Sequence, residues 1–213
     1  MKETVVSITN ILMCLCFVSI FFKRKEVDKS FKQDFNFFVP IGILTTIMGF
    51  VYHYLRSQGK TVQDVQLLWD FILYTTVFMS FFYTSLSVKI FSSSEKMLKG
   101  WKWFCKIKGV LFVFLQYNMA EVRVHFKDAE ILIFLISSLL PVFYLFIGFL
   151  VRLKNKDFHL LGLASFLYLA GVGNRIFGKD LSEVFNANSI MHLGIVVLLI
   201  TVFKQIRKKD LEG

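Results

Sequence analysis

Cysteine, proline and charged residues are all scarce in this chain of 213 residues. Three cysteines and two prolines exclude a disulfide scaffold and a collagen-like or proline-rich chain. Charged residues make up only 19% of the sequence, whereas a soluble domain carries about a quarter. Intrinsic disorder is excluded too, because 55% of the residues are hydrophobic and disordered segments have low hydrophobicity.

The hydrophobic residues come in long runs, and the mean hydropathy is +0.60. A helix needs roughly 20 apolar residues to cross a hydrocarbon core about 30 Å thick. Runs of this length, separated by polar clusters, predict an all-α bundle of seven transmembrane helices in one integral membrane domain, residues 1–213. The predicted helices cover residues 4–22, 37–55, 67–91, 107–126, 131–151, 158–177 and 184–203.

Lysine and arginine set the predicted orientation. With the N-terminus outside, seven of the 25 basic residues fall on the outer side and eighteen on the inner side. Cytoplasmic loops are enriched in these residues, which predicts an outer N-terminus and a cytoplasmic C-terminus. The net charge of +10 then reflects topology and attraction to anionic lipid headgroups rather than binding of nucleic acid. We expect a multi-pass protein of the plasma (cytoplasmic) membrane whose partner is membrane lipid.

In this topology the polar residues inside the predicted helices gather at the outer ends. A titratable residue at membrane depth is a functional hypothesis by default. His192 lies about 12 Å inside the start of its helix, with Asn188 one turn before it on the same face. A partner for His192 could be His53, Asp70 or Asn188. The outer polar residues are His53, Asp70, Glu121, Asn174, Arg175, Asn186, Asn188, Ser189 and His192.

This combination suits a metal site. Zinc binds imidazole nitrogen and carboxylate oxygen, and a catalytic zinc has three protein ligands and a water. We therefore predict Zn²⁺ held by His53 and His192, with Asp70 as the catalytic carboxylate that orients or deprotonates the water. Further contacts to metal or substrate could come from Asn188, Glu121, Asn174 and Arg175.

Simpler roles are open for the same side chains. His53 and Asp70 could face headgroup water at the interface. Asn188 is a poor zinc ligand and could instead hydrogen-bond a neighbouring helix, as polar residues often do in bundles.

The pattern also resembles a known superfamily. A His late in the second of seven helices, an Asp early in the third and a His-Leu motif in the seventh are similar to the alkaline ceramidase, progestin/adiponectin-receptor and Per1 superfamily. The resemblance implies zinc held by His53 and His192, water activation assisted by Asp70, and cleavage of lipid amides. Residues 185–193, Phe-Asn-Ala-Asn-Ser-Ile-Met-His-Leu, also resemble the motif Phe-Asn-His-Asn-Asp-Leu-Tyr-His-Leu of uncharacterised bacterial seven-helix proteins.

The sequence departs from these patterns at three positions. Asn188 stands where the superfamily has the first His of its helix-seven pair, and Gly49 stands where it has a Ser. Ala187 replaces an extra His of the bacterial proteins. Three functions stay open: a metal-dependent hydrolase of lipid amides or esters at the outer leaflet, a non-catalytic receptor-like or assembly protein, and a small transporter with an outer proton or ion site.

Two further patterns are set aside. Residues 173–180 resemble a phosphate-binding loop, but Asp180 replaces the Ser or Thr that binds magnesium, and a membrane helix precedes the loop instead of a strand. The cysteines at positions 14, 16 and 105 are expected to be buried small hydrophobic residues rather than disulfide or metal ligands.

Overall fold

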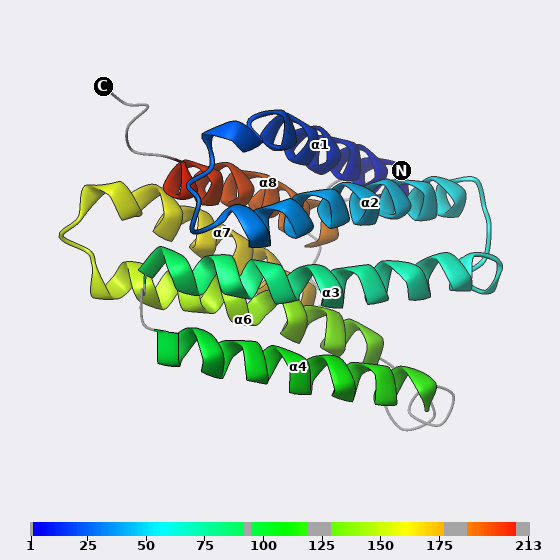
Figure 1. The fold of residues 1–213 in the computed structure, drawn as a ribbon. Coiled ribbons are helices and arrows are strands. Elements are labelled where there is room, and N and C mark those ends of the chain that lie inside the picture. The colour runs from blue at the N-terminus through cyan, green and yellow to red at the C-terminus, as the bar shows by residue number, and fades with distance from the viewer. Residues whose placement is uncertain (1, 92–94, 119–128, 177–186, 208–213) are drawn as a thin grey trace.

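The computed structural model describes residues 2–91, 95–118, 129–176 and 187–207, and within these ranges the regular structure is helical (Figure 1). This confirms the all-α fold class. The α-helices are α1 (Lys2–Phe22), α2 (Lys32–Ser57), α3 (Gln66–Phe91), α4 (Glu95–Tyr117), α6 (Ala129–Val151), α7 (His159–Ile176) and α8 (Ala187–Ile206). Single 3₁₀ turns lie at Arg24–Glu26 (η1), Gln63–Val65 (η2) and Lys156–Phe158 (η3).

Four stretches of the described chain are long and apolar enough to cross a membrane. They are Lys2–Phe22, Lys32–Ser57, Gln63–Phe91 and Asn188–Ile206. Shorter apolar helical stretches are Pro141–Val151 in α6 and His159–Gly173 in α7. The fold is thus that of a helical protein in which several helices could span a bilayer.

The fourth helix differs most from its predicted position. It begins at Glu95, whereas the prediction began at residue 107, and its described part ends before the predicted end at residue 126. The first turns of α4 carry lysines on the exposed side, which made this stretch resemble a loop. The side that packs inward repeats at helical spacing and consists of Leu98, Trp101, Cys105, Lys108 and Phe112.

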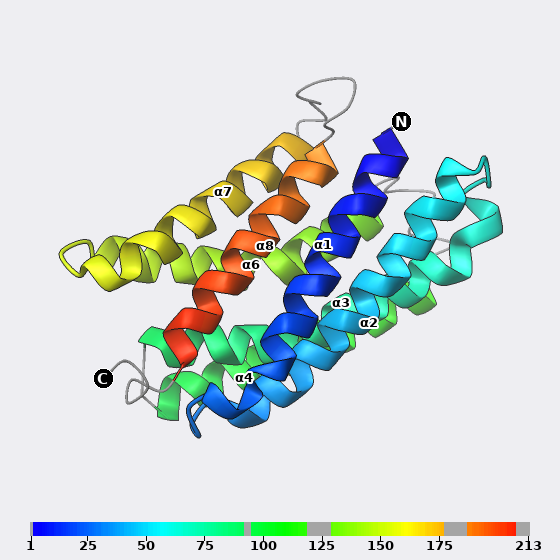
Figure 2. The ribbon, with the colours of Figure 1, turned by 90° about the horizontal axis from the view of Figure 1, so that it is seen from above.

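Six helices form a closed ring. Going round it, α1 packs against α2, α2 against α3, α3 against α6, α6 against α7, α7 against α8, and α8 against α1. Figure 2 shows α1 between α8 and α2. Helix α4 lies outside this ring against α3, and the Trp101 ring also meets Tyr144 of α6, with 5.6 Å between the ring centroids.

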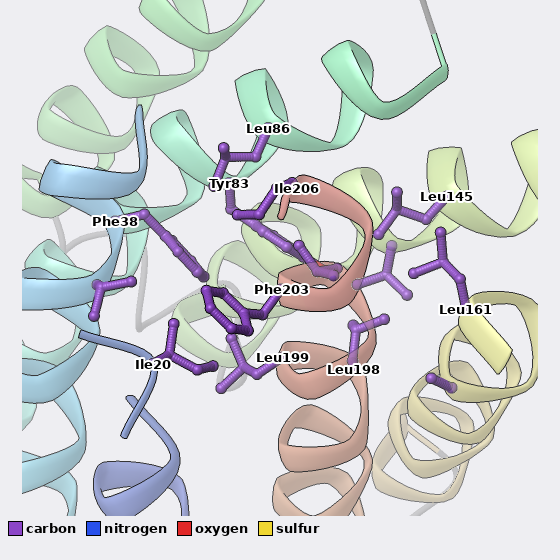
Figure 3. Close-up of a cluster of buried hydrophobic side chains, with 14 of the residues drawn as sticks. Ile20, Phe38, Tyr83, Leu86, Leu145, Leu161, Leu198, Leu199, Phe203 and Ile206 are labelled. Carbon is purple, nitrogen blue, oxygen red and sulfur yellow. The ribbon is translucent and has the colours of Figure 1, made fainter. Parts of the chain in front are cut away.

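The hydrophobic core fills the middle of the ring (Figure 3). Tyr83 of α3 stacks on Phe38 of α2 with ring centroids 5.2 Å apart, and Phe203 of α8 meets Phe35 of α2 at 6.2 Å. Aromatic rings carry much of this packing because they bury large areas and favour stacked or edge-on contacts. Fully buried aliphatic residues complete the core, among them Leu86, Leu145, Leu161 and Ile206.

Helices α7 and α8 touch backbone to backbone. A Cβ atom added at Gly171 would lie 2.9 Å from the Met191 Cα, and one added at Gly194 would lie 3.0 Å from the Tyr168 Cα. Small residues at such crossings let helices approach closely, which is a common way of packing helices in membranes. This close contact fixes the position of α8, and therefore of His192, against the rest of the ring.

At the other end of α8 the chain is tied to the connection between α1 and α2. Val27 and Arg207 form an isolated antiparallel bridge, and the Asp28 backbone N–H donates to the Ile206 carbonyl oxygen at 3.0 Å. Arg207 Nε also pairs with Glu26 Oε2 at 2.9 Å. We call these contacts the α8 clasp; they close the ring of helices at this end.

A buried carboxylate joins α2 to α3 at the same end of the bundle. Asp34 is 8% exposed, and its Oδ2 accepts from the Ser85 hydroxyl at 2.7 Å and from Lys89 Nζ at 2.7 Å. Lys89 also donates to the Ser30 carbonyl oxygen at 2.8 Å. A buried charge is tolerated when it is paired and hydrogen-bonded in this way.

The α7–α8 contact predicts a sharp difference between two glycines of the same helix. Gly171→Ala should destabilise the bundle by about 1–3 kcal/mol, because overpacking against backbone cannot be relieved by a rotamer change. Gly173→Ala is the matched control, since no atom of the described residues lies within 4 Å of a Cβ at that position. Thermal unfolding in a mild detergent measures both, and equal melting temperatures for the two variants would contradict the close contact.

Candidate functional site

Two histidines far apart in the sequence lie side by side at one end of the bundle. His53 is near the end of α2, and His192 is near the start of α8. Their ring centroids are 6.5 Å apart, with an angle of 70° between the ring planes. We call this the histidine end of the bundle.

Helix α1 supplies a hydrogen-bonding partner for each histidine. The Nδ1 atom of His53 lies 2.6 Å from Glu3 Oε2, and the Nδ1 atom of His192 lies 3.0 Å from Thr9 Oγ1. We call Glu3, Thr9, His53 and His192 the histidine cluster. It joins three neighbouring helices of the ring, α1, α2 and α8.

These contacts bear on which ring nitrogen carries hydrogen. When the single hydroxyl hydrogen of Thr9 is donated to the Val6 carbonyl oxygen at 2.9 Å, Thr9 Oγ1 accepts from His192 Nδ1–H; in the other tautomer of His192 the Thr9 hydroxyl donates to Nδ1. An ionised Glu3 carboxylate only accepts, so His53 Nδ1 is the donor. In the neutral imidazole the other nitrogen then holds a lone pair. His53 therefore has Nε2 as the atom available for a metal ion or a proton, and His192 has it in the tautomer whose Nδ1–H donates to Thr9.

Burial increases along the cluster from the edge of the bundle inwards. The Glu3 side chain is 39% exposed and that of His53 is 13% exposed, while His192 and Thr9 are 8% and 4% exposed. A polar route thus begins at a carboxylate open to the surroundings and leads to a buried imidazole.

A buried amide fills the space beside Gly49, one turn before His53 on α2. Asn10 of α1 is 4% exposed, and its Oδ1 atom lies 2.6 Å from where a Cβ of residue 49 would be. The Asn10 Nδ2 donates to the Val6 carbonyl oxygen at 3.0 Å. The position at which the resemblance expects a serine side chain is thus taken by an amide from another helix.

Asp70, the predicted catalytic carboxylate, lies near the start of α3. Its Oδ1 accepts from Gln66 Nε2 of the same helix at 2.9 Å. Between the start of α3 and His53 lies the ring of Tyr52. The Trp69 ring of α3 contacts Tyr52 with centroids 5.2 Å apart, and the Tyr52 ring is 5.0 Å from that of its neighbour His53. The hydrogen bonds that orient the histidines come from α1 instead.

The other predicted site residues are only partly covered. Asn188 is half-buried in the first turn of α8, one turn before His192. Glu121 and Asn186 lie outside the described residues, as do the side chains of Asn174 and Arg175 at the end of α7. Within the described ranges, no group of three or more His, Cys, Asp or Glu side chains is arranged to hold a metal ion.

The polar residues of α1 are not among the predicted site residues, although the sequence carries a signal for them. The buried positions of α1 include Val6, Asn10, Met13 and Phe17, which follow a helical spacing of three or four residues. Glu3 and Asn10 are two turns apart on this stripe. A carboxylate and an amide on the otherwise apolar, inward side of a helix indicate a polar partner inside the bundle.

Comparison with known proteins places the chain in a family. A family model described as a family of unknown function, DUF6962, matches residues 5–211. The chain belongs to this family. None of the curated proteins and none of the solved structures matches it, so the DUF6962 assignment carries no activity with it. The histidine cluster and Asn10 all lie within the matched region apart from Glu3, which precedes it.

The contact between Asn10 and Gly49 predicts a coupled pair. Gly49→Ser alone should destabilise the protein by about 1–3 kcal/mol, because the new side chain meets the Asn10 amide in a filled space. In an Asn10→Ala background, Gly49→Ser should lower the free energy of unfolding by clearly less. The difference is a measurable interaction energy in a double-mutant cycle.

Thermal unfolding in detergent of the wild type, the two single variants and the double variant tests this coupling. Gly109→Ser serves as the control, because a Cβ at position 109 has no neighbour within 4 Å in the part of the chain that the structure describes. Strictly additive effects of Asn10→Ala and Gly49→Ser would show that the two residues do not share this space.

Proposed function

We propose that this DUF6962 protein is a seven-span protein of the plasma membrane, with its N-terminus outside and its C-terminus in the cytoplasm. We propose further that the histidine cluster is the centre of a metal-dependent hydrolase of lipid amides or esters, acting at the outer leaflet. The observation that carries this proposal is the meeting of His53 and His192 with both Nδ1 atoms already engaged. The seven-span topology rests on the distribution of basic residues described above.

The donor atoms fit a divalent cation such as Zn²⁺ held by two imidazoles. A metal-binding histidine usually donates its other N–H to a carboxylate or a similar acceptor, which fixes the ring and makes the free nitrogen more basic. Glu3 is placed to accept this hydrogen bond from His53, and Thr9 would accept it from His192 in the tautomer with hydrogen on Nδ1. Asn188 or water would supply the remaining oxygen ligands. A bound cation of this kind polarises a carbonyl group and makes a coordinated water more acidic.

The remaining roles follow from where the side chains lie. Glu3 and Thr9 would keep the two imidazoles in their tautomers and orientations. Asp70, a carboxylate on the adjoining helix, would accept the proton of the attacking water. Lipid is the substrate class because the exposed side chains around the bundle are mostly apolar, for example Ile8 of α1 and Phe71 of α3, which are 53% and 42% exposed.

A non-catalytic seven-helix protein, receptor-like or active in assembly, is the second candidate. It is favoured by the packing of Asn10 against Gly49, since an amide with a fixed position stands where the resemblance expects a catalytic hydroxyl. In this case the histidine cluster would be a buried polar contact that fixes α1, α2 and α8 together. A small transporter that uses the cluster as a proton or ion site is the third candidate.

Metal content and lipid turnover distinguish these candidates. We expect bound metal in protein purified in mild detergent without chelator, and a lower melting temperature after chelation. His192→Ala should abolish metal binding and the hydrolysis of lipid amides or esters, and Glu3→Gln should weaken metal binding about 10–100-fold. Elemental analysis and lipid mass spectrometry are the measurements.

His159→Ala is the matched control. His159 begins α7 at the opposite end of the bundle, where its Nε2 contacts the Leu153 carbonyl oxygen at 2.7 Å, so metal content and turnover should be unchanged. If the wild type lacks metal and its melting temperature ignores chelators, the hydrolase proposal fails. Loss of stability alone in His192→Ala would favour the non-catalytic protein, and pH-dependent flux into liposomes would favour the transporter.

A further inference from the structure

Helix α4 has two sides of opposite character. The side facing away from the bundle carries four exposed lysines and an exposed tryptophan in its first turns. We call these residues the cationic strip: Lys96, Lys99, Lys102, Trp103 and Lys106. Trp103 is 66% exposed, and Lys106 Nζ lies 5.0 Å from the centre of its ring.

One hydrogen bond defines which residues of α4 lie beside which residues of α3. Lys108 Nζ, on the packed side of α4, donates to Ser80 Oγ at 2.8 Å. Further along the same seam the rings of Tyr74 and Phe112 meet with centroids 5.2 Å apart. The two helices are therefore antiparallel, and each step toward the start of α4 corresponds to a step toward the end of α3. On this register Lys99 is level with Lys89 of α3.

The charged residues of α3 mark its depth in a bilayer. Asp70 and Lys89 are the charged residues of this helix, and at 1.5 Å per residue they are about 28 Å apart, close to the thickness of a hydrocarbon core. Ser80 lies near the middle. Measured along the helix axis, Lys106 then lies about 10 Å closer to the middle of the bilayer than Lys89, and Lys108 about 13 Å closer.

The bilayer has to adapt to these lysines. Lys108 is half-buried and bonded to Ser80, but Lys102 and Lys106 face outwards. An exposed ammonium group inside hydrocarbon is costly, and the cost is relieved by side chains reaching toward the interface and by local thinning that brings water and headgroups inwards. Phosphate oxygens of an anionic headgroup would both hydrate and neutralise the strip.

We propose that the cationic strip of α4 binds anionic phospholipid headgroups and draws the headgroup plane toward the middle of the bilayer on this side of the bundle. Charge complementarity supports lipid as the occupant. The same side of the helix continues as an apolar surface typical of contact with acyl chains, with Val110 and Phe114 exposed by 70% and 63%. A tryptophan where the two parts meet is characteristic of the membrane interface. The proposal needs α3 to lie in a bilayer but does not depend on the hydrolase.

Lipid selectivity tests the binding. Spin-labelled phosphatidylglycerol should associate with the full-length protein in phosphatidylcholine liposomes at least about fivefold more than spin-labelled phosphatidylcholine. Changing all four lysines of the strip to Gln should remove most of this preference. The matched control changes Lys23, Lys25, Lys154 and Lys156 to Gln, which are also exposed and carry the same total charge. Equal losses in the two quadruple variants would mean only diffuse attraction and would overturn the proposal.

Two further measurements test contact with lipid and depth. With Trp69 and Trp101 changed to Phe, the remaining Trp103 fluorescence should be quenched by brominated anionic lipid, and absence of quenching would indicate a protein partner on this surface. In a variant without native cysteines, Lys99→Cys and Lys106→Cys should both react with a membrane-impermeant maleimide from the side on which α4 begins. An unreactive Lys106→Cys beside a reactive Lys99→Cys would exclude the inward displacement of headgroups.

Discussion

The interior of an apolar helix bundle holds little water, so a polar side chain buried there is stabilised by a partner on another helix or on its own backbone. This constraint accounts for the main polar contacts of the protein. Glu3 and Thr9 hold the two histidines, Ser85 and Lys89 hold Asp34, and Ser80 holds Lys108. Each contact joins different helices and so also specifies which helices are neighbours.

The apolar part of the structure is stabilised by close approach of the helices at glycine residues, in addition to the burial of hydrophobic side chains. Backbones touch where Gly171 and Gly194 cross between α7 and α8, and the rings of Phe17, Phe91 and Phe149 lie directly against Gly42, Gly148 and Gly162 of the next helix. A ring on a glycine brings two helices closer than two side chains would allow, which increases dispersion contacts. Close approach at small residues is typical of helices that pack in membranes, and four stretches of the described chain are long and apolar enough to cross one.

The sequence predicts most helices well because hydrophobic length is a strong signal. It fails at the start of α4, where Lys96, Lys99 and Lys102 occupy the exposed side of a helix and resemble a charged loop. For the site, the predicted topology places His53 and His192 on the same side of the membrane. It does not show that α1 lies between α2 and α8, because this order depends on how the helices pack. Glu3 and Thr9 are absent from the prediction for this reason, whereas Asp70 is included because it lies near the outer end of the third predicted helix, a position that also matches the resemblance.

The α8 clasp joins residues that are synthesised early to residues that are synthesised last, so it can form only at the end of synthesis. Glu3, Thr9 and His53 leave the ribosome long before His192, and the bridge between Val27 and Arg207 forms later still. Until then α1 lacks α8, the neighbour that covers Thr9, and the early helices form an open, incomplete assembly. During that interval Thr9 lacks its contact with His192, so the arrival of the last helix is expected to be the slow step in forming the bundle.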